Sequence, residues 1–316
     1  MSMHQIDLFD GHCDTLSRRL EEGGGLWENG GHLDLKRTRK FRRYAQFFAL
    51  FADPDEHPGI PLWKLCRRQY ALFLRELREN CAYLVHCRTG AEAKAVLRSG
   101  RTAAFLSVEG AELLDCDLCK LERAQAMGVR AVNLTWNHAN ALSGSNAEEP
   151  DRGLTEHGRA FVRRMEALGM LVDVSHLSDP GFWDVAAMAG KPFFASHSNA
   201  RAVFPASRNL TDGQFTAIIE HHGVAGLNMY SPFLGEDPDI DTVVAHLEHF
   251  LALGGERSVS LGGDWDGISA MPRGLTGIGD MDRLYERLLQ RNYHEALVRG
   301  VFFENLMRVV NEVCIM

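Results

Sequence analysis

Short apolar runs alternate along the chain with longer segments in which apolar residues recur at helical spacing. Short runs of this kind, bounded by polar or glycine-containing segments, are typical of buried strands. Eight of them occur, at residues 6–9, 44–50, 103–108, 131–134, 171–174, 193–195, 223–228 and 258–261. Long amphipathic patterns predict helices over residues 63–79, 155–168, 179–189 and 242–253.

Strands that alternate with helices indicate βα units around a parallel sheet. Eight such units predict an α/β fold, a (β/α)8 TIM barrel with loop insertions, formed by residues 1–316 as a single domain. The long interval after the second run contains Tyr83-Leu84-Val85, a candidate extra strand, and the polar segment 143–151 is a candidate insertion. Residues 293–313 predict a closing helical region, in which Gly300 is a candidate helix break.

Composition narrows the class of protein. The chain has 316 residues, is 45% hydrophobic and carries a formal net charge of -8, with no long basic run, so nucleic acid is not an expected partner. No apolar stretch reaches membrane-spanning length, and we expect no membrane partner.

Seven cysteines, an odd number, favour reduced thiols. Because Met1-Ser2-Met3-His4-Gln5 lacks the features of a signal peptide, we expect a cytoplasmic protein.

Potential metal ligands and proton-transfer groups follow five of the eight predicted strands. In a barrel the carboxyl ends of the strands meet at one face, where the active site lies. An isolated histidine is more often a core residue, and a single His-x-Asp pair is often only a hydrogen-bonded strand end. Five strand ends of the same kind are difficult to explain in that way. The residues are His12, Asp14, Glu109, His176, His197 and Asp264.

His12 and Asp14 are two residues apart, so on an extended strand both side chains point to the same face. Burying this polar pair is costly unless something binds it, and imidazole nitrogen and carboxylate oxygen are both good zinc ligands. Asp173 lies an odd step from His176 and is therefore not counted as a ligand.

Three histidines, one aspartate and one glutamate are enough for two metal ions. Glu109 is the natural bridging ligand, because a carboxylate has two oxygens. Nitrogen-rich ligation favours zinc over magnesium or calcium, so we expect two Zn²⁺ per chain. Two ions roughly 3.5–4 Å apart can hold a bridging hydroxide and polarise a carbonyl.

These residues resemble the membrane (renal) dipeptidases, a branch of the metal-dependent amidohydrolases. The resemblance covers the chain from Asp10 to about Asn305, and its motifs are specific only together. They are Asp10-Gly11-His12-x-Asp14, His32-Leu33-Asp34-Leu35, Gln46-Phe47, Glu109-Gly110, Asp173-Val174-Ser175-His176, Ser196-His197-Ser198, Arg208-Asn209 and Gly263-Asp264-x-Asp266-Gly267.

The resemblance implies a (β/α)8 barrel with a binuclear zinc site and a role for each matching residue. His12 and Asp14 would bind one zinc, Glu109 would bridge both ions, and His176 and His197 would bind the second. The implied activity is zinc-dependent hydrolysis of the peptide bond of a dipeptide, L-Xaa-L-Xaa or L-Xaa-D-Xaa, by the bridging hydroxide.

Three further residues receive roles in the same reaction. Arg208 would bind the substrate carboxylate, for which a guanidinium fork is well suited. Asp264 would carry the proton from the water to the leaving amine. Tyr230, just past the seventh predicted strand, is a candidate pocket residue.

One position departs from the family pattern. Family members often have a histidine directly after Leu-Thr on the fourth strand, where it contacts the substrate carbonyl. Here Trp136 occupies that place, and Asn137 and His138 follow. Either Asn137 or His138 could polarise the carbonyl, and both are retained as catalytic candidates.

Two other functions are compatible with the same residues. A binuclear-metal amidohydrolase could act on another amide, such as an N-acyl amino acid or a β-lactam. A barrel of this kind could also bind a metal or peptide without turnover, although it would then be expected to have lost a ligand or Asp264. The family resemblance and the base rate for oligomers both favour a homodimer, here of a bacterial-type relative without a lipid anchor.

Overall fold

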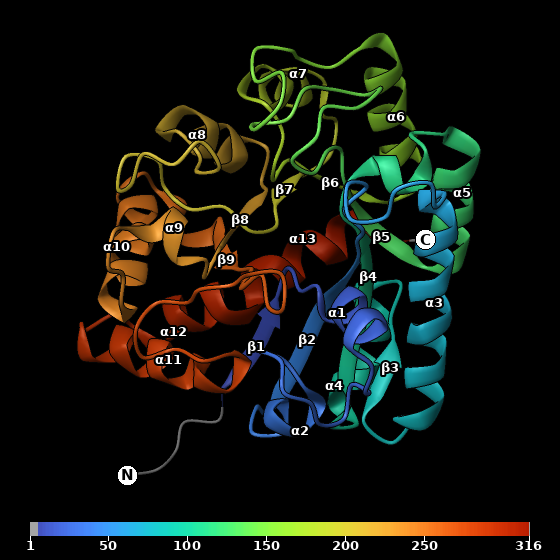
Figure 1. Cartoon of the computed structure of the whole chain (residues 1–316). Helices are drawn as coiled ribbons and strands as arrows, with labels where there is room; N and C mark the ends of the chain where they lie inside the picture. The colour runs from blue at the N-terminus through green and yellow to red at the C-terminus, as the bar shows by residue number, and fades with distance from the viewer. Residues whose placement is uncertain (1–5, 316) are drawn as a thin grey trace.

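The computed structural model describes residues 6–315, and residues 1–5, on which the signal-peptide expectation rests, lie outside that range. Parallel strands run through the centre of this part of the chain, and helices surround them (Figure 1). The strands are β1 (Asp7–Asp10), β2 (Arg43–Leu50), β3 (Leu84–His86), β4 (Thr102–Val108), β5 (Val129–Asn133), β6 (Leu171–Asp173), β7 (Phe194–Ala195), β8 (Val224–Leu227) and β9 (Val259–Leu261).

Eight of these strands close into a barrel. The pairing runs from β2 through β1, β9, β8, β7, β6 and β5 to β4, and β4 pairs with β2 again to complete the ring. Strand β3 pairs with the first residues of β4, Leu84 opposite Thr102, whereas β5 pairs with the last ones. The structure thus confirms the predicted (β/α)8 barrel and the extra strand near residue 84.

The helices pack outside the ring, as Figure 1 shows for α3, α5, α6, α8 and α10. They are α1 (Thr15–Glu22), α2 (Leu35–Thr38), α3 (Leu62–Glu79), α4 (Gly90–Arg98), α5 (Leu118–Met127), α6 (Glu156–Ala167), α7 (Asp179–Met188), α8 (Asp212–Glu220), α9 (Ser231–Leu234), α10 (Ile240–Ala252), α11 (Met281–Gln290), α12 (Glu295–Arg299) and α13 (Asn305–Val313). Short 3₁₀ turns add η1 (Ala111–Leu114), η2 (Gly255–Arg257) and η3 (Ile278–Asp280), and η4 (Gly300–Glu304) is π-helical.

The four helices predicted from amphipathic patterns are α3, α6, α7 and α10. Three of them begin at an N-cap side chain: Thr155 accepts a hydrogen bond from the Gly158 amide, Ser178 accepts one from the Gly181 amide, and Asp239 forms a capping box with Thr242. Side chains at these positions satisfy amide groups that a helix leaves unpaired at its start, which is why the helices begin there.

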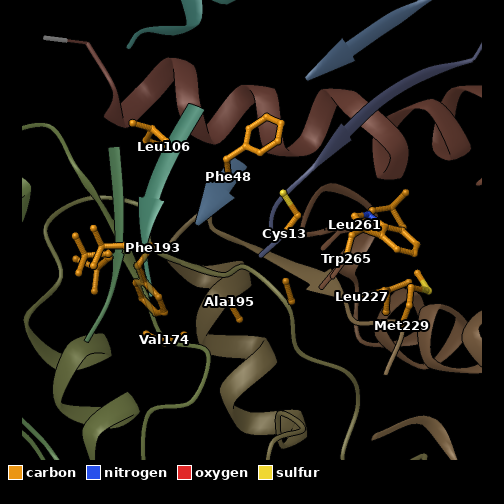
Figure 2. Packing of buried hydrophobic residues seen from close by; sticks show 14 of the residues in the cluster. Cys13, Phe48, Leu106, Val174, Phe193, Ala195, Leu227, Met229, Leu261 and Trp265 are labelled. Atoms are coloured by element: carbon orange, nitrogen blue, oxygen red, sulfur yellow. The ribbon is translucent and has the colours of Figure 1, made fainter. Parts of the chain in front are cut away.

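The period-two alternation of the strands divides the apolar residues between two cores. Leu8 and Phe48 point outward and pack with the surrounding helices, and Figure 2 shows part of this outer core. Phe9, Phe47 and Phe105 belong to the second core, where their rings stack with centroids 5.1–5.7 Å apart. The inner core fills the barrel with aromatic side chains, so the barrel is not an open pore.

The end of the chain covers the amino-terminal side of the barrel. Asn305 donates hydrogen bonds to the carbonyl groups of Glu256 and Val259, at the start of β9. Phe303 reaches the inner core, with its ring centroid 6.1 Å from that of Phe9. Helix α12 ends before Gly300, as the sequence suggests, but the chain continues as a π-helical turn instead of leaving the helix.

The expectations about membrane-spanning segments and about the cysteines can be compared with this structure. None of the helices within residues 6–315 combines the length and the apolar composition that crossing a membrane would require. All seven cysteines lie in the described range, and none of them forms a disulfide there.

Replacing Phe303 with alanine tests the packing of the last helical segment against the inner core. Phe303 is 2% exposed, and its removal leaves a cavity, so we expect a loss of about 3–5 kcal/mol in the free energy of unfolding by denaturant titration. Ile315→Ala, at a side chain that is 62% exposed, is the control and should change it by less than about 0.5 kcal/mol. Equal effects of the two variants would contradict this packing role.

Candidate metal centre

The six candidate residues at the strand ends meet at the carboxyl-terminal end of the barrel. His12 and Asp14 follow β1, Glu109 follows β4, and His176, His197 and Asp264 follow β6, β7 and β9. Two overlapping groups place possible ligand atoms within 4.8 Å of one another: His12 with Glu109 and His197, and His12 with Asp14 and Asp264. The barrel therefore brings together side chains that are up to about 250 positions apart in the sequence.

Glu109 lies at the middle of the cluster and contacts all three imidazoles. One carboxylate oxygen, Oε2, is 3.3 Å from His12 Nε2. The other, Oε1, is 3.0 Å from His176 Nε2 and 3.6 Å from His197 Nε2. One oxygen thus faces His12 and the other faces the remaining two histidines, which is the arrangement expected of a bridging ligand.

The contacts suit a metal better than they suit a hydrogen-bond network. His176 Nε2 and His197 Nε2 lie 3.0 Å apart, so two ring nitrogens point at the same space. His12 Nε2 is 3.4 Å from Asp14 Oδ2, but within residues 6–315 neither ring nitrogen of His12 forms a well-aligned hydrogen bond. Asp14 Oδ1 is likewise buried without a partner there. Buried lone pairs that converge without donors are what cations bind, and this donor set fits the expected metal site.

Charge within the cluster is set by burial and by Glu109. Burial lowers the pKa of His176 to about 4 and that of His197 well below its usual value, so both rings are neutral and have lone pairs at neutral pH. Burial also acts to lower the pKa of His12, but the Glu109 and Asp14 carboxylates outweigh it and raise that pKa. Burial acts to raise the pKa of Glu109, whereas His12 and His176 hold it well below its usual value.

Two of these side chains come from strained backbone. His176 has φ of 70° and Asp264 has φ of 60°, in the left-handed region that residues other than glycine seldom adopt. Strand β6 ends at Asp173, and the sharp turn after it brings His176 to the cluster. Such strain is common at functional sites, where the surrounding structure maintains it.

Asp264 is positioned by Asn228, a residue that the sequence analysis did not identify. Asn228 is fully buried after β8 and donates a hydrogen bond of 3.0 Å to Asp264 Oδ2. Its own amide is held by Asn199 Oδ1, and its Oδ1 accepts from the amide of Tyr230. Burial raises the pKa of Asp264. An asparagine directly after an apolar strand was the available signal for Asn228.

Arg208, the predicted substrate-binding residue, lies beside the cluster with its side chain buried. It donates hydrogen bonds to Ser198 Oγ and to the carbonyl oxygen of His197, both at 3.2 Å, and its guanidinium lies 5.6 Å from the Phe233 ring centre. Burial lowers the pKa of Arg208 to about 10, which leaves it charged at neutral pH. Within residues 6–315 its Nε has no hydrogen-bond partner.

A cavity of about 490 Å³ opens onto the cluster. Asp14, Glu109, His176 and Asp264 line it on the barrel side. Its walls carry four aromatic side chains, namely Phe51, Trp136, Tyr230 and Phe233. Tyr230, the candidate pocket residue, is thus part of the cavity wall. Phe51 and Phe233 were not predicted, because nothing in the sequence distinguishes them from core aromatics.

Asn137 and His138 lie in different surroundings. Asn137 lines the cavity, and its Oδ1 is 3.0 Å from His176 Nδ1. His138 is not among the residues that line the cavity. Its ring instead lies among three carboxylates, with Nδ1 3.4 Å from Glu148 and Nε2 3.6–3.7 Å from Asp53 and Asp55. Of the two candidates, only Asn137 lies beside the predicted ligands.

The loop that carries Trp136 and Asn137 is tied to the start of η1. Glu112 accepts hydrogen bonds from the amide of Trp136 at 3.4 Å and from Asn140 Nδ2 at 2.7 Å. Burial raises the pKa of Glu112 to about 7. This carboxyl group therefore changes protonation near neutral pH beside one wall of the cavity.

A parallel barrel that buries three imidazoles around one carboxylate at its carboxyl end is an arrangement typical of metal-dependent hydrolases. Comparison with protein families makes this class more specific. Residues 2–315 match the membrane dipeptidase family, peptidase family M19, and the chain belongs to that family. The resemblance inferred from the motifs is thereby confirmed.

Three individual proteins are similar to this chain over most of its length. An uncharacterised protein from the region 5′ of pqqA in Klebsiella pneumoniae is 32% identical over 268 residues, which is 81% of this chain and 98% of that protein. A Rhodobacter sphaeroides metallopeptidase, solved with a phosphinate mimic of the dipeptide L-Ala-D-Ala, is 30% identical with a TM-score of 0.89. A structure described as dipeptidase AC is also 30% identical, with a TM-score of 0.90. Each of these two alignments covers 98% of this chain and 99% of the other.

Glu112→Gln tests the titration of the carboxyl beside the cavity wall. The pKa of Glu112 is about 7 in the folded protein, above the usual 4.5. The protonated carboxyl of Glu112 therefore stabilises the folded state at low pH, and this stabilisation is lost as the pH rises through 7. From pH 4 to pH 8 the variant should therefore gain roughly 2 kcal/mol in free energy of unfolding relative to wild type, allowing for screening at a partly exposed group.

Denaturant titrations of both proteins across this pH range measure the difference. The metal-ligand candidates are the same in both proteins, so their titration cancels. A difference that does not change with pH would contradict the raised pKa of Glu112.

Proposed function

We propose that this protein is a binuclear zinc dipeptidase that hydrolyses the peptide bond of L-Xaa-L-Xaa or L-Xaa-D-Xaa dipeptides. The observation that carries the proposal is the contact of one buried carboxylate, Glu109, with three imidazoles, beside a cavity that Glu109 and His176 line together with four aromatic side chains. Membership of the membrane dipeptidase family supports the reaction class. We place the whole of residues 1–316 in one barrel domain that carries this site.

Five residues would hold the metal ions. His12 and Asp14 would bind one ion, His176 and His197 the other, and Glu109 both, as their contacts suggest. Bound ions of this kind polarise a carbonyl and lower the pKa of a water molecule. Two neutral histidines on one side and two carboxylates near His12 make the donor set suitable for zinc.

Asp264 would move the proton. It lines the cavity, lies within the group formed by His12 and Asp14, and is held from behind by Asn228. Its raised pKa brings the carboxyl closer to the range in which it can both accept a proton from water and return it to the leaving amine. The hydrogen bond from Asn228 fixes one oxygen, Oδ2, and the other oxygen would face the substrate.

The substrate would lie between the aromatic walls. Arg208 would bind its carboxylate: it lines a small neighbouring pocket that shares His176 with the cavity, and its guanidinium lies 5.6 Å from the ring centre of the cavity residue Phe233. Tyr230 and Phe233 would bound the same end of the cavity. The Rhodobacter sphaeroides relative was solved with a mimic of L-Ala-D-Ala, which supports a small dipeptide as the substrate class. A homodimer and a cytoplasmic location stay predictions.

Asp264→Asn tests the proton-transfer role together with the metals. Purified wild type should contain about two zinc ions per chain and cleave dipeptides in a panel of L-L and L-D substrates, and a chelator should abolish that activity. The variant should retain its zinc and lose about 10²- to 10⁴-fold in kcat, because it can no longer transfer a proton. Asp237→Asn, at an exposed carboxylate outside the cavity lining, is the control.

Each outcome of this experiment has a meaning for the proposal. Two zinc ions without dipeptide cleavage would redirect the site to another amide substrate or to binding. Absence of zinc under metal-replete conditions, or full activity in Asp264→Asn, would contradict the assignment of these residues.

Asn137→Ala and His138→Ala form a matched pair for the position that departs from the family pattern. Asn137 contacts His176 and lines the cavity, so its loss should lower kcat by about 10-fold or more. His138 faces acids away from the cavity lining, and its loss should change kcat by less than about threefold. The reverse order in steady-state kinetics would assign the carbonyl contact to His138.

A further inference from the structure

The two ring nitrogens of His197 face different partners. Nε2 points at Glu109 and His176, in the proposed metal centre. Nδ1 is 2.6 Å from the hydroxyl oxygen of Ser196. An imidazole that binds a metal through Nε2 carries its proton on Nδ1. The Ser196 oxygen must then accept a hydrogen bond from Nδ1–H. The hydroxyl group of Ser196 must therefore donate its own hydrogen bond to another acceptor.

Asp173 is the acceptor available to the Ser196 hydroxyl. It is fully buried at the end of β6, and its Oδ1 accepts hydrogen bonds of 3.0 Å from the amides of Ser175 and Ser196. Its second oxygen, Oδ2, is buried within residues 6–315 without a hydrogen-bond partner and is therefore the acceptor left for this hydroxyl. Burial raises the pKa of Asp173, whereas the Ser196 side chain and the backbone amides act to lower it. A carboxylate can only accept, so the order of donors runs from His197 through Ser196 to Asp173.

The backbone fixes Ser196 in this place. Its carbonyl oxygen lies 2.0 Å from the position that a Cβ would take at Gly226 and 1.7 Å from the same position at Gly262. Only glycine allows β8 and β9 to approach the end of β7 so closely. The hydroxyl of Ser196 therefore starts from a backbone position with little freedom to move.

We propose that Ser196 and Asp173 form a polar relay that fixes the tautomer of His197 and so increases the metal affinity of the site. Both are positioning residues, because they act through His197 and do not reach the cavity. The inference rests on the proposed metal centre. It also explains why Asp173, three residues before His176, is buried near the ligands without being one of them.

The relay predicts an unusual effect of Asp173→Asn. The amide oxygen can keep the two backbone hydrogen bonds, which leaves its NH₂ group facing Ser196. The Ser196 oxygen would then accept a hydrogen bond from this NH₂ group, and the Ser196 hydroxyl would donate one to His197 Nδ1. The ring proton of His197 would consequently lie on Nε2, where it blocks metal binding. Ser196→Ala only removes the partner of Nδ1. Asp173→Asn should therefore weaken zinc binding more than Ser196→Ala does.

The test measures zinc affinity by competition with a chromophoric chelator, using wild type, Ser196→Ala, Asp173→Asn and the double variant. Ser196→Ala should weaken zinc binding about 10- to 100-fold, as expected for an outer-shell partner, and Asp173→Asn more than that. The double variant should bind zinc better than Asp173→Asn alone, because no hydroxyl remains to donate to His197. If Asp173→Asn acted only by removing a negative charge, its effect on zinc affinity and that of Ser196→Ala would instead add in the double variant.

Two controls separate the relay from damage to the fold. Ser143→Ala removes another buried hydroxyl, which has no hydrogen-bond partner within residues 6–315, and should leave zinc affinity unchanged. Unfolding of the metal-free variants should stay close to that of metal-free wild type. The absorption spectrum of the cobalt(II)-substituted protein reports the change at His197 directly, and Ser196→Ala should alter it even if Asp173→Asn does not fold.

The outcomes distinguish the relay from the proposed function. Wild-type zinc binding and dipeptide cleavage with unchanged affinity and cobalt spectrum in Ser196→Ala would overturn the relay alone. Additive effects in the double variant would overturn the tautomer mechanism. A wild type that binds no zinc would overturn both the relay and the proposed metal centre.

Discussion

The contact between Glu109 and three imidazoles is the constraint on which the rest of the site depends. A carboxylate that is 4% exposed is costly to bury, and the cost falls only if positive charge or a cation lies beside it. The barrel meets this requirement by ending β1, β6 and β7 near the same point, so that His12, His176 and His197 reach one side chain. The fold and the chemistry are therefore coupled through a single buried group.

Buried carboxylates also maintain the frame around these residues. Asp10 accepts hydrogen bonds from the amide of His12 and from Gln46 on one oxygen, and from the amide of Gly263 and the indole of Trp265 on the other. It thus joins β1 to β2 and to the loop after β9. Asp173 does the same between the ends of β6 and β7. Rigid connections of this kind can hold His176 and Asp264 in left-handed backbone, which would otherwise relax.

The barrel, and the grouping of the candidate residues at its carboxyl end, could be predicted because both follow from local patterns. An apolar run marks each strand, and a polar residue just after the run lies at the carboxyl face of any parallel barrel. Short helices such as α1 and α4 have too few residues to give a periodic signal. The surroundings of Asn137, His138 and Asn228 depend on loop paths and long-range contacts, which no spacing in the sequence encodes.

The helical cover at the amino-terminal side of the barrel has a consequence for synthesis of the chain. Phe9, from the first strand, packs against Phe303. Asn305 donates a hydrogen bond to the carbonyl group of Val259, the first residue of β9. A growing chain can form individual βα units early, but its central aromatic layer stays open to water until these late residues have been added. Closure of the barrel must therefore wait until residues 303–305 have been synthesised, and until then the exposed phenylalanines of the inner core are a site for aggregation.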